Sequence, residues 1–218
     1  MNEKIKVKEW IEQYKIVAIV RGVRPEQIVE TAVALYNGGI RTLEITFNQA
    51  SDTCIQDTQK SIALVKEHFG DKMCVGAGTV MTVEQAEAAK TGGADFGLAP
   101  NINIEVIKRM EKIGMVSIPG AMTPTEIATA YEAGAAIVKL FPAGNLGVEY
   151  VKAIQGPINH IPLMAVGGVN LDNINTFLDN GFMSVGIGSN IVKNALIENG
   201  EFEKIQDLAK SYTDCIAK

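Results

Sequence analysis

The chain has 218 residues, of which 47% are hydrophobic and 21% are charged. That composition can bury a large core, which excludes an intrinsically disordered chain. The net charge is −5 and no basic block is present, which argues against nucleic acid as a partner. These values do not exclude a local pocket for one small anionic ligand.

The N-terminal segment and the cysteines indicate a cytoplasmic location. Residues 1–15 are charged throughout and lack the apolar stretch of a signal peptide, and no run approaches the ~20 apolar residues of a membrane span. The three cysteines form neither a zinc motif nor a C-x-x-C pair, so we expect reduced thiols. Neither histidine has a second candidate ligand beside it, so we expect no metal site.

Hydrophobic periodicity, with glycine and proline punctuation, predicts alternating helices and strands along the whole chain. In the first half, Pro25 opens one helix, and Thr82 with Gln85 three residues later has the capping-box spacing that starts another. The expected elements of this half are a helix over 4–14, a strand over 15–22, a helix over 25–38, a strand over 42–47, a helix over 53–68, a strand over 73–75, a helix over 82–92 and a strand over 95–98.

The same alternation continues through the second half. Thr123, Pro124 and Glu126 give one helix a cap, a proline at its first position and an early acid. The expected elements are a helix over 103–114, a strand over 115–118, a helix over 123–134, a strand over 136–142, a helix over 147–154, a strand over 163–166, a helix capped by Asn170 or Asp172 and ended by Gly181, a strand over 183–186 and a helix over 201–216.

Eight strands therefore alternate with helices, and glycines end the helices before most strands. This count and alternation predict a single-domain α/β fold, a (β/α)8 TIM barrel over residues 1–218 with an extra N-terminal helix. The competing fold is an open doubly wound sheet, which would want a G-x-G-x-x-G motif after its first strand. Residues 21–25 do not supply that motif, so we favour the barrel.

The strand over 136–142 carries one lysine, Lys139, in an otherwise apolar run. A strand of this kind is covered on both faces, so its lysine points either into the core or into a pocket at the strand's end. Burial disfavours the ammonium and frees the amine to form a Schiff base with a ketone. The alternative is a lysine at a strand edge whose amine reaches water.

Barrel enzymes place their active site at the carboxyl ends of the strands, so the polar residues in or after each strand are the candidate site. Glu44 stands inside the second strand, and Lys139 is its natural partner because a buried carboxylate is rarely unpaired. The glutamate can be a core ion-pair partner, or it can shuttle protons while the lysine forms and breaks an imine. The other candidates are Arg21, Thr46, Asn48, Thr79, Asn101, Thr123, Gly167, Gly168, Gly188 and Ser189.

Glycines after the last two strands predict a phosphate site. Gly167 with Gly168, and Gly188 with Ser189, expose backbone N–H groups ahead of helices, and barrels often bind phosphate at the loops after strands seven and eight. The alternative is a pair of tight turns that need glycine only for positive φ. Arg21, at the end of the first strand, can hold a carboxylate in a bidentate fork.

In this order, the residues resemble the family of class I aldolases acting on 2-keto-3-deoxy-6-phosphogluconate (KDPG), 4-hydroxy-2-oxoglutarate and 2-keto-3-deoxy-6-phosphogalactonate. The resemblance covers about residues 16–192, nearly the whole chain. The matching segments are Ile19–Arg21, Leu43–Thr46, Gly76–Val80, Ala99–Pro100, Pro119–Gly120, Met122–Glu126, Val138–Pro142, Gly167–Val169 and Gly188–Ser189.

This resemblance implies a lyase that cleaves KDPG and related 2-keto-4-hydroxy acids to pyruvate and an aldehyde, either glyceraldehyde 3-phosphate or glyoxylate. It implies that Lys139 forms the imine and that Glu44 is the proton-transfer base. It also implies that Thr79 helps to hold the pyruvate carboxylate, and we group Arg21 and Pro100 with it. The family's barrels assemble as homotrimers, use a small-molecule substrate and need no metal or other cofactor.

The sequence leaves the sugar acid open. Some family members carry an arginine where this chain has Asn48, and others use the arginine that ends the first strand, here Arg21. Phosphogalactonate-type members resemble this chain at position 48 and in the runs over 99–102 and 165–169. We therefore expect cleavage of both epimers, with a phosphogalactonate aldolase as the alternative.

Two other function classes compete with the aldolase. One is an isomerase or epimerase in which Glu44 is the base and Lys139 stabilises charge. The other is a non-catalytic barrel that binds a sugar phosphate, which would have no need of a neutral lysine.

Overall fold

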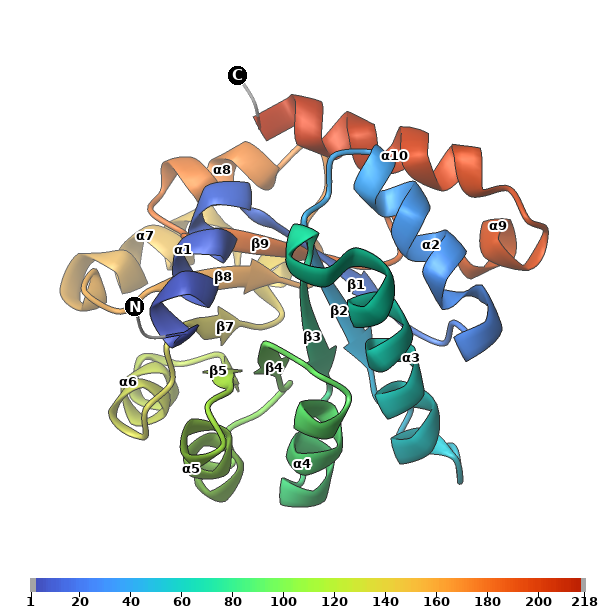
Figure 1. Cartoon of the computed structure of the whole chain (residues 1–218). Coiled ribbons are helices and arrows are strands. Elements are labelled where there is room, and N and C mark those ends of the chain that lie inside the picture. Colours follow the sequence, from blue (N-terminus) through green and yellow to red (C-terminus); the bar gives the residue numbers. More distant parts are fainter. Residues whose placement is uncertain (1–2, 217–218) are drawn as a thin grey trace.

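All the strands lie side by side in one parallel sheet that curves into a barrel, with helices around its outside (Figure 1). The structure, a computed structural model, describes residues 3–216. Its strands are β1 (Ile16–Val20), β2 (Thr42–Thr46), β3 (Cys74–Gly78), β4 (Phe96–Leu98), β5 (Val116–Ile118), β6 (Gly120–Ala121), β7 (Val138–Leu140), β8 (Leu163–Val166) and β9 (Ser184–Ile187).

The strand order is β5-β4-β3-β2-β1-β9-β8-β7-β6, and its two ends are neighbours in the chain. Only Pro119 separates β5 from β6, and proline has no N–H to continue a ladder. On one side the N–H of Ala99 donates to the carbonyl of Ile118, and on the other the N–H of Lys139 donates to the carbonyl of Pro119. The interrupted strand therefore closes the sheet, and the predicted (β/α)8 barrel is confirmed.

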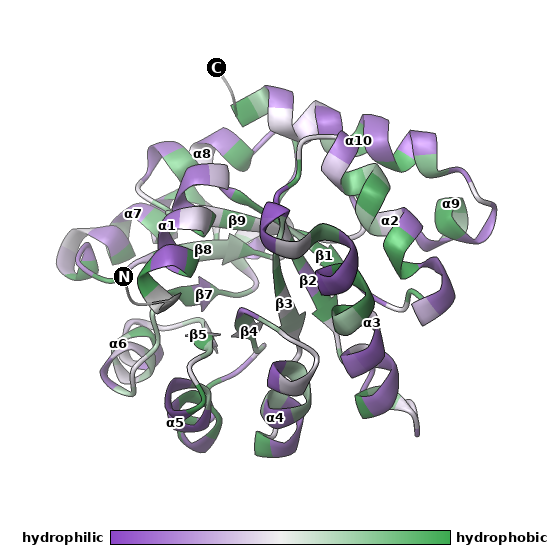
Figure 2. Ribbon diagram, viewed as in Figure 1, coloured by the Kyte–Doolittle hydropathy of each residue, from purple (hydrophilic) through white to green (hydrophobic). Residues whose placement is uncertain are grey.

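Apart from α1, which lies at the amino ends of the strands, the helices cover the outside of the barrel, with apolar residues toward the strands and hydrophilic residues outward (Figure 2). No helix among residues 3–216 is long and apolar enough to cross a membrane. The helices are α1 (Glu3–Tyr14), α2 (Pro25–Asn37), α3 (Cys54–Phe69), α4 (Val83–Thr91), α5 (Ile104–Lys112), α6 (Pro124–Glu132), α7 (Gly147–Ile158), α8 (Ile174–Asp179), α9 (Asn194–Glu198) and α10 (Phe202–Ile216), with short 3-10 turns η1 (Gly70–Lys72) and η2 (Ala143–Asn145).

The start of α8 differs from the prediction, because the helix begins at Ile174 and neither Asn170 nor Asp172 caps it. Asn170 Oδ1 accepts a hydrogen bond from the N–H of Asp172 at 2.9 Å, and Asn173 Oδ1 accepts one from the N–H of Asn170 at 2.8 Å. These hydrogen bonds close a turn ahead of the helix. Asparagine side chains often do this, because they bond nearby backbone N–H groups and so compete with helix formation.

Alternate residues of each strand face opposite sides of the barrel wall. In β2, Leu43 and Ile45 pack in the apolar layer between strands and helices, and in β7 Val138 and Leu140 do the same. The residues between them therefore face the interior. A second apolar cluster fills that interior from β1, β4, β5 and β8, and Ile11 of α1 joins it at the amino ends of the strands.

Two glycines of β3 make room inside the barrel. A Cβ on Gly76 would lie 2.2 Å from Cε2 of Phe96, and a Cβ on Gly78 would lie 1.8 Å from Oε1 of Glu44. Real atoms do not approach so closely, and both neighbours are buried. The absence of side chains on β3 therefore lets one large ring and one carboxyl group fit across the barrel.

We expect Gly76→Ala to destabilise the fold by about 1–3 kcal/mol, the usual cost of overpacking a filled core. The matched control is Gly156→Ala in α7, where an added Cβ meets nothing within 4 Å and should be neutral or slightly stabilising. Chemical denaturation of both variants measures the difference. Equal stability of the two variants would contradict the packing described for Phe96.

Candidate active site

Glu44 and Lys139 come from strands on opposite sides of the barrel. Counting β5 and β6 as one position, three strands separate β2 from β7 whichever way the ring is followed. Both side chains face the interior, where Glu44 is 1% exposed and Lys139 is 6% exposed. The structure therefore brings these two sequence candidates together, and Lys139 does not have the water-exposed amine of the alternative interpretation.

Burial and the neighbouring charges set the protonation of this pair. Burial raises the pKa of Glu44, against the opposing effects of Lys139 and then Arg21. Burial lowers the pKa of Lys139; Glu44 opposes that change, and Arg21 adds to it. Oε2 of Glu44 is buried and has no hydrogen-bond partner among the described residues. The pair thus combines an amine shifted toward its neutral form with a carboxyl oxygen open to a proton.

Phe141 connects the lysine to one of the glycine loops. The Lys139 Nζ lies 4.8 Å from the centroid of the Phe141 ring, which is cation–π distance. A Cβ on Gly167 would lie 3.1 Å from the same ring. Phe141 lies in the matching segment Val138–Pro142 but was not among the residues predicted to form the site. The signal that could have placed it is its spacing, two residues after Lys139 at the same end of β7.

Thr79, just after β3, has a left-handed backbone with φ of 56°, which is rare for a β-branched residue. Gln49 holds this turn, because its Nε2 donates to the Thr79 carbonyl at 2.9 Å. Gln85 in turn donates from Nε2 to Oε1 of Gln49 at 2.8 Å, and its own Oε1 accepts from the N–H of Met81 at 2.8 Å. Sequence reasoning missed this network, although it did identify Gln85 in the capping box that the structure contains.

Pro100, just after β4, is half-buried against the closing strand. A Cβ on Gly120 would lie 2.5 Å from the Pro100 carbonyl carbon and oxygen. Gly120 is the register partner of Lys139 in the neighbouring strand β7. Close backbone packing therefore places Pro100 two strands from the lysine, with only the closing strand between them.

The two glycine loops lie together at the carboxyl ends of β8 and β9. Gly167 and Gly168 have φ of 86° and 76°, and the N–H of Gly144 donates to the Gly167 carbonyl at 2.7 Å. Asn190 Nδ2 donates to the Val169 carbonyl at 2.8 Å, which ties the loop containing Gly188 and Ser189 to the first. Neither α8 nor α9 starts directly after these loops, so the loop N–H groups, rather than helix ends, are the donors available to an anion.

Arg21 is exposed just beyond β1, which pairs with β9 on one side and β2 on the other. A Cβ on Gly188 would lie 3.8 Å from the Cβ of Ile19, so the Gly188 loop abuts the end of β1. Thr79 follows β3, two strands away in the opposite direction. Arg21 therefore follows a strand next to the glycine loops and two strands from Thr79. Its charge acts on both Glu44 and Lys139, so its role at the substrate carboxylate stays a prediction.

The remaining sequence candidates divide between the interior and the surface. Thr46 is 6% exposed, and its buried hydroxyl has no partner among the described residues. Asn48 is exposed and accepts a hydrogen bond from the N–H of Ala50 at 3.2 Å. Thr123 is the N-cap of α6, and Asn101 is exposed after β4. Among residues 3–216, no group of three or more His, Cys, Asp and Glu is placed to hold a metal ion.

Comparison with known proteins identifies relatives that match nearly the whole chain. The family model for KDPG and KHG aldolase matches residues 7–208. The 2-dehydro-3-deoxy-6-phosphogalactonate aldolase of Escherichia coli K12 is 32% identical, covering 95% of this chain and 99% of its own length. The 2-dehydro-3-deoxy-phosphogluconate aldolase of Treponema pallidum is 33% identical, covering 94% and 95%.

A solved structure gives the same result. The KDPG aldolase of Legionella pneumophila, crystallised with pyruvate captured as a covalent carbinolamine intermediate, is 27% identical, with a TM-score of 0.83 over 94% of this chain and 97% of that one. The names of the relatives indicate a lyase of the aldolase type. With the barrel and nearly its full length matched, the chain belongs to the KDPG and KHG aldolase family.

Proposed function

We propose that the chain is a Schiff-base aldolase that cleaves KDPG and related 2-keto-4-hydroxy acids to pyruvate and an aldehyde. The observation that carries the proposal is the burial of Lys139 opposite Glu44 inside the barrel. Burial lowers the pKa of this amine, and a neutral lysine that faces a ketone is the nucleophile that imine chemistry requires. The covalent carbinolamine named for the Legionella enzyme supports the same chemistry here.

In the first half of the reaction, the Lys139 amine attacks the C2 carbonyl of the substrate. The carbinolamine that forms then loses water to give a protonated imine. The C3–C4 bond breaks next: the C4 hydroxyl gives its proton to the Glu44 carboxylate, the aldehyde leaves, and the bonding electrons flow into the imine to make an enamine. The imine nitrogen takes up the electrons, so the proposal involves no metal ion.

In the second half, Glu44 returns its proton to C3 of the enamine, and water hydrolyses the resulting pyruvate imine. A carboxyl group whose pKa is raised by burial suits both steps, because it accepts a proton more readily than an exposed carboxylate does and can then return it. The unpartnered Oε2 of Glu44 is the oxygen that we assign to this exchange.

We assign the two ends of the substrate to opposite strands of the ring. The turn at Thr79, with Pro100 beside it, would hold the pyruvate carboxylate. The loops at Gly167 and Gly168, and at Gly188 and Ser189, would hold the phosphate through their N–H groups and the Ser189 hydroxyl. β3 and β8 lie across the barrel from each other, so the keto carbon beside the carboxylate falls between them, near Lys139.

The preferred substrate epimer and the oligomeric state are proposed from the relatives and the family resemblance. Relatives named for the gluconate and the galactonate series are 33% and 32% identical to this chain, which favours neither. We propose that both phosphorylated epimers are cleaved, together with 4-hydroxy-2-oxoglutarate at lower efficiency. The family resemblance further supports a homotrimer.

The test of the imine is reductive trapping. Incubation with pyruvate and borohydride should modify one lysine irreversibly, and peptide mass mapping should place the adduct on Lys139. Lys139→Arg should keep the fold but abolish trapping, because arginine stays protonated. Modification of an exposed lysine such as Lys152, or turnover without trapping, would contradict the proposal and favour the isomerase class.

The pH dependence of imine formation should move in opposite directions in two variants. Glu44 raises the pKa of Lys139 and Arg21 lowers it. In a plot of trapping rate against pH, Glu44→Gln should therefore shift the rising part of the curve to lower pH, whereas Arg21→Gln should shift it to higher pH. In a separate measurement, Glu44→Gln should slow exchange of the pyruvate methyl protons by about 10²–10⁴-fold, the usual value of general acid–base catalysis. A shift in the same direction in both variants would contradict the electrostatic assignment.

Substrate kinetics test the phosphate end. Ser189→Ala should raise KM for phosphorylated substrates by about tenfold, the scale of one hydrogen bond to a charged group, and leave 4-hydroxy-2-oxoglutarate nearly unchanged. The two phosphorylated epimers should differ in kcat/KM by no more than about a hundredfold, since we identify no strand residue that would hydrogen-bond the hydroxyl group at which they differ. Equal effects of the variant on all substrates, or outright refusal of one epimer, would contradict this arrangement.

A further inference from the structure

A cavity of about 460 Å³ lies at the opposite end of the barrel from Lys139 and Glu44. Its walls come from α1, from the start of β3, from the segments that lead into β4 and β5, and from the adjoining ends of α3 and α4. The α1 helix covers only part of this end, since it packs mainly against β5 and β9. The volume is within the range of about 300–1,000 Å³ that is usual for small-molecule sites.

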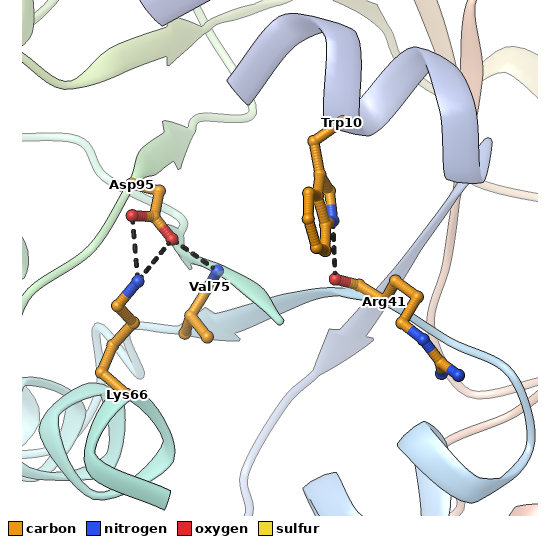
Figure 3. A network of polar contacts seen from close by, with 5 residues as sticks. All are labelled: Trp10, Arg41, Lys66, Val75 and Asp95. Atoms are coloured by element: carbon orange, nitrogen blue, oxygen red, sulfur yellow. Dashed lines mark hydrogen bonds and ion pairs between the residues drawn. The ribbon is translucent and has the colours of Figure 1, made fainter. Parts of the chain in front are cut away.

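The wall of this cavity is more positive than the rest of the chain. Three lysines and two aspartates line it, although the whole protein carries a net charge of −5. Lys66 Nζ lies 3.1 and 3.0 Å from the two carboxylate oxygens of Asp95, and Asp95 Oδ2 also accepts from the N–H of Val75 at 2.9 Å (Figure 3). That pair neutralises itself, so Lys6, Lys90 and Asp71 are the charged residues of the wall that remain, with one positive charge in excess.

The floor of the cavity is apolar. Trp10 projects from α1, and its Nε1 donates to the Arg41 carbonyl at 2.9 Å (Figure 3). The one polar atom of the side chain is therefore already hydrogen-bonded, and the rest of the ring is apolar. Met73, Cys74 and Val116 are buried beside it. Burial raises the pKa of the Cys74 thiol well above its ordinary value, so this group adds no charge to the floor.

We propose that this cavity is a second binding site, for a small aromatic carboxylate. The carboxylate would lie between Lys6 and Lys90, and the ring would lie on Trp10, which is half-buried. An apolar floor with a few convergent charged groups at its rim is the usual construction of a site for such ligands. The site is separate from the imine chemistry and stands whether or not that chemistry is correct.

The single tryptophan of the chain makes the proposal directly testable. In ¹⁵N-labelled full-length protein, Trp10 gives the one indole N–H signal. Titration with 2-naphthoate should shift that signal saturably, and the neutral isostere 2-naphthamide should bind at least fivefold more weakly. Added salt should weaken the naphthoate but not the naphthamide, because the charge contacts are partly exposed. Equal binding of the two probes, or an unmoved indole signal, would overturn the proposal.

Variants separate this cavity from other sites. Lys6→Ala and Lys90→Ala should each weaken naphthoate binding about twofold to fivefold, as expected of partly exposed ion pairs, and Val7→Phe should weaken it by crowding the wall beside Trp10. Lys108→Ala, which removes an equal charge from an exposed position outside the cavity, is the matched control. Lys139→Met should bind as the unaltered protein does. Loss of binding in Lys139→Met, or equal losses in Lys90→Ala and Lys108→Ala, would assign the probe elsewhere.

Discussion

The burial of two opposite charges inside the barrel is the constraint on which the site depends. Taking a carboxylate and an ammonium out of water is costly, and mutual attraction recovers only part of the cost. For Glu44 and Lys139, burial is the largest influence on each pKa, and the partner's charge opposes it. The pKa values of both groups are therefore shifted toward the neutral forms, and the charge of each partner limits the shift of the other. A pair of ordinary surface charges would not have this property, because water would keep both ionised.

Glycines of β3 leave the space that the Glu44 side chain and its neighbours occupy in the barrel interior. Gly78 leaves the space that the Glu44 carboxyl occupies, and Gly76 leaves the space for Phe96 below it. Beyond β3, the left-handed turn at Thr79 persists because Gln49 and Gln85 bond its neighbouring backbone groups. Strain of this kind costs about 1–3 kcal/mol and survives only where surrounding contacts enforce it.

The two ends of the barrel have different constructions. At the carboxyl ends, a loop with two positive-φ glycines follows β8, the strand that pairs with the one carrying the buried lysine, at the end where barrels carry their chemistry. At the amino ends, α1 partly covers the interior, and the Lys66–Asp95 pair and Trp10 join helix, strand and loop. The same wall of strands therefore separates one polar mouth from a cavity with an apolar floor and a positive rim.

The sequence by itself determined the alternation of elements, because short-range periodicity and punctuation act over a few residues. The sequence also indicated Lys139 and Glu44 as candidate site residues, because each is a charged residue within a short apolar segment. Only the tertiary structure decided that β2 and β7 face each other, that the Gly188 loop abuts Ile19 near the end of β1 and that Phe141 packs on Gly167. The sequence also placed the start of α8 too early, because the competing turn depends on side-chain hydrogen bonds that spacing does not reveal. These features depend on the closure and register of the barrel, which bring together residues far apart in the chain, and no local pattern records such distances.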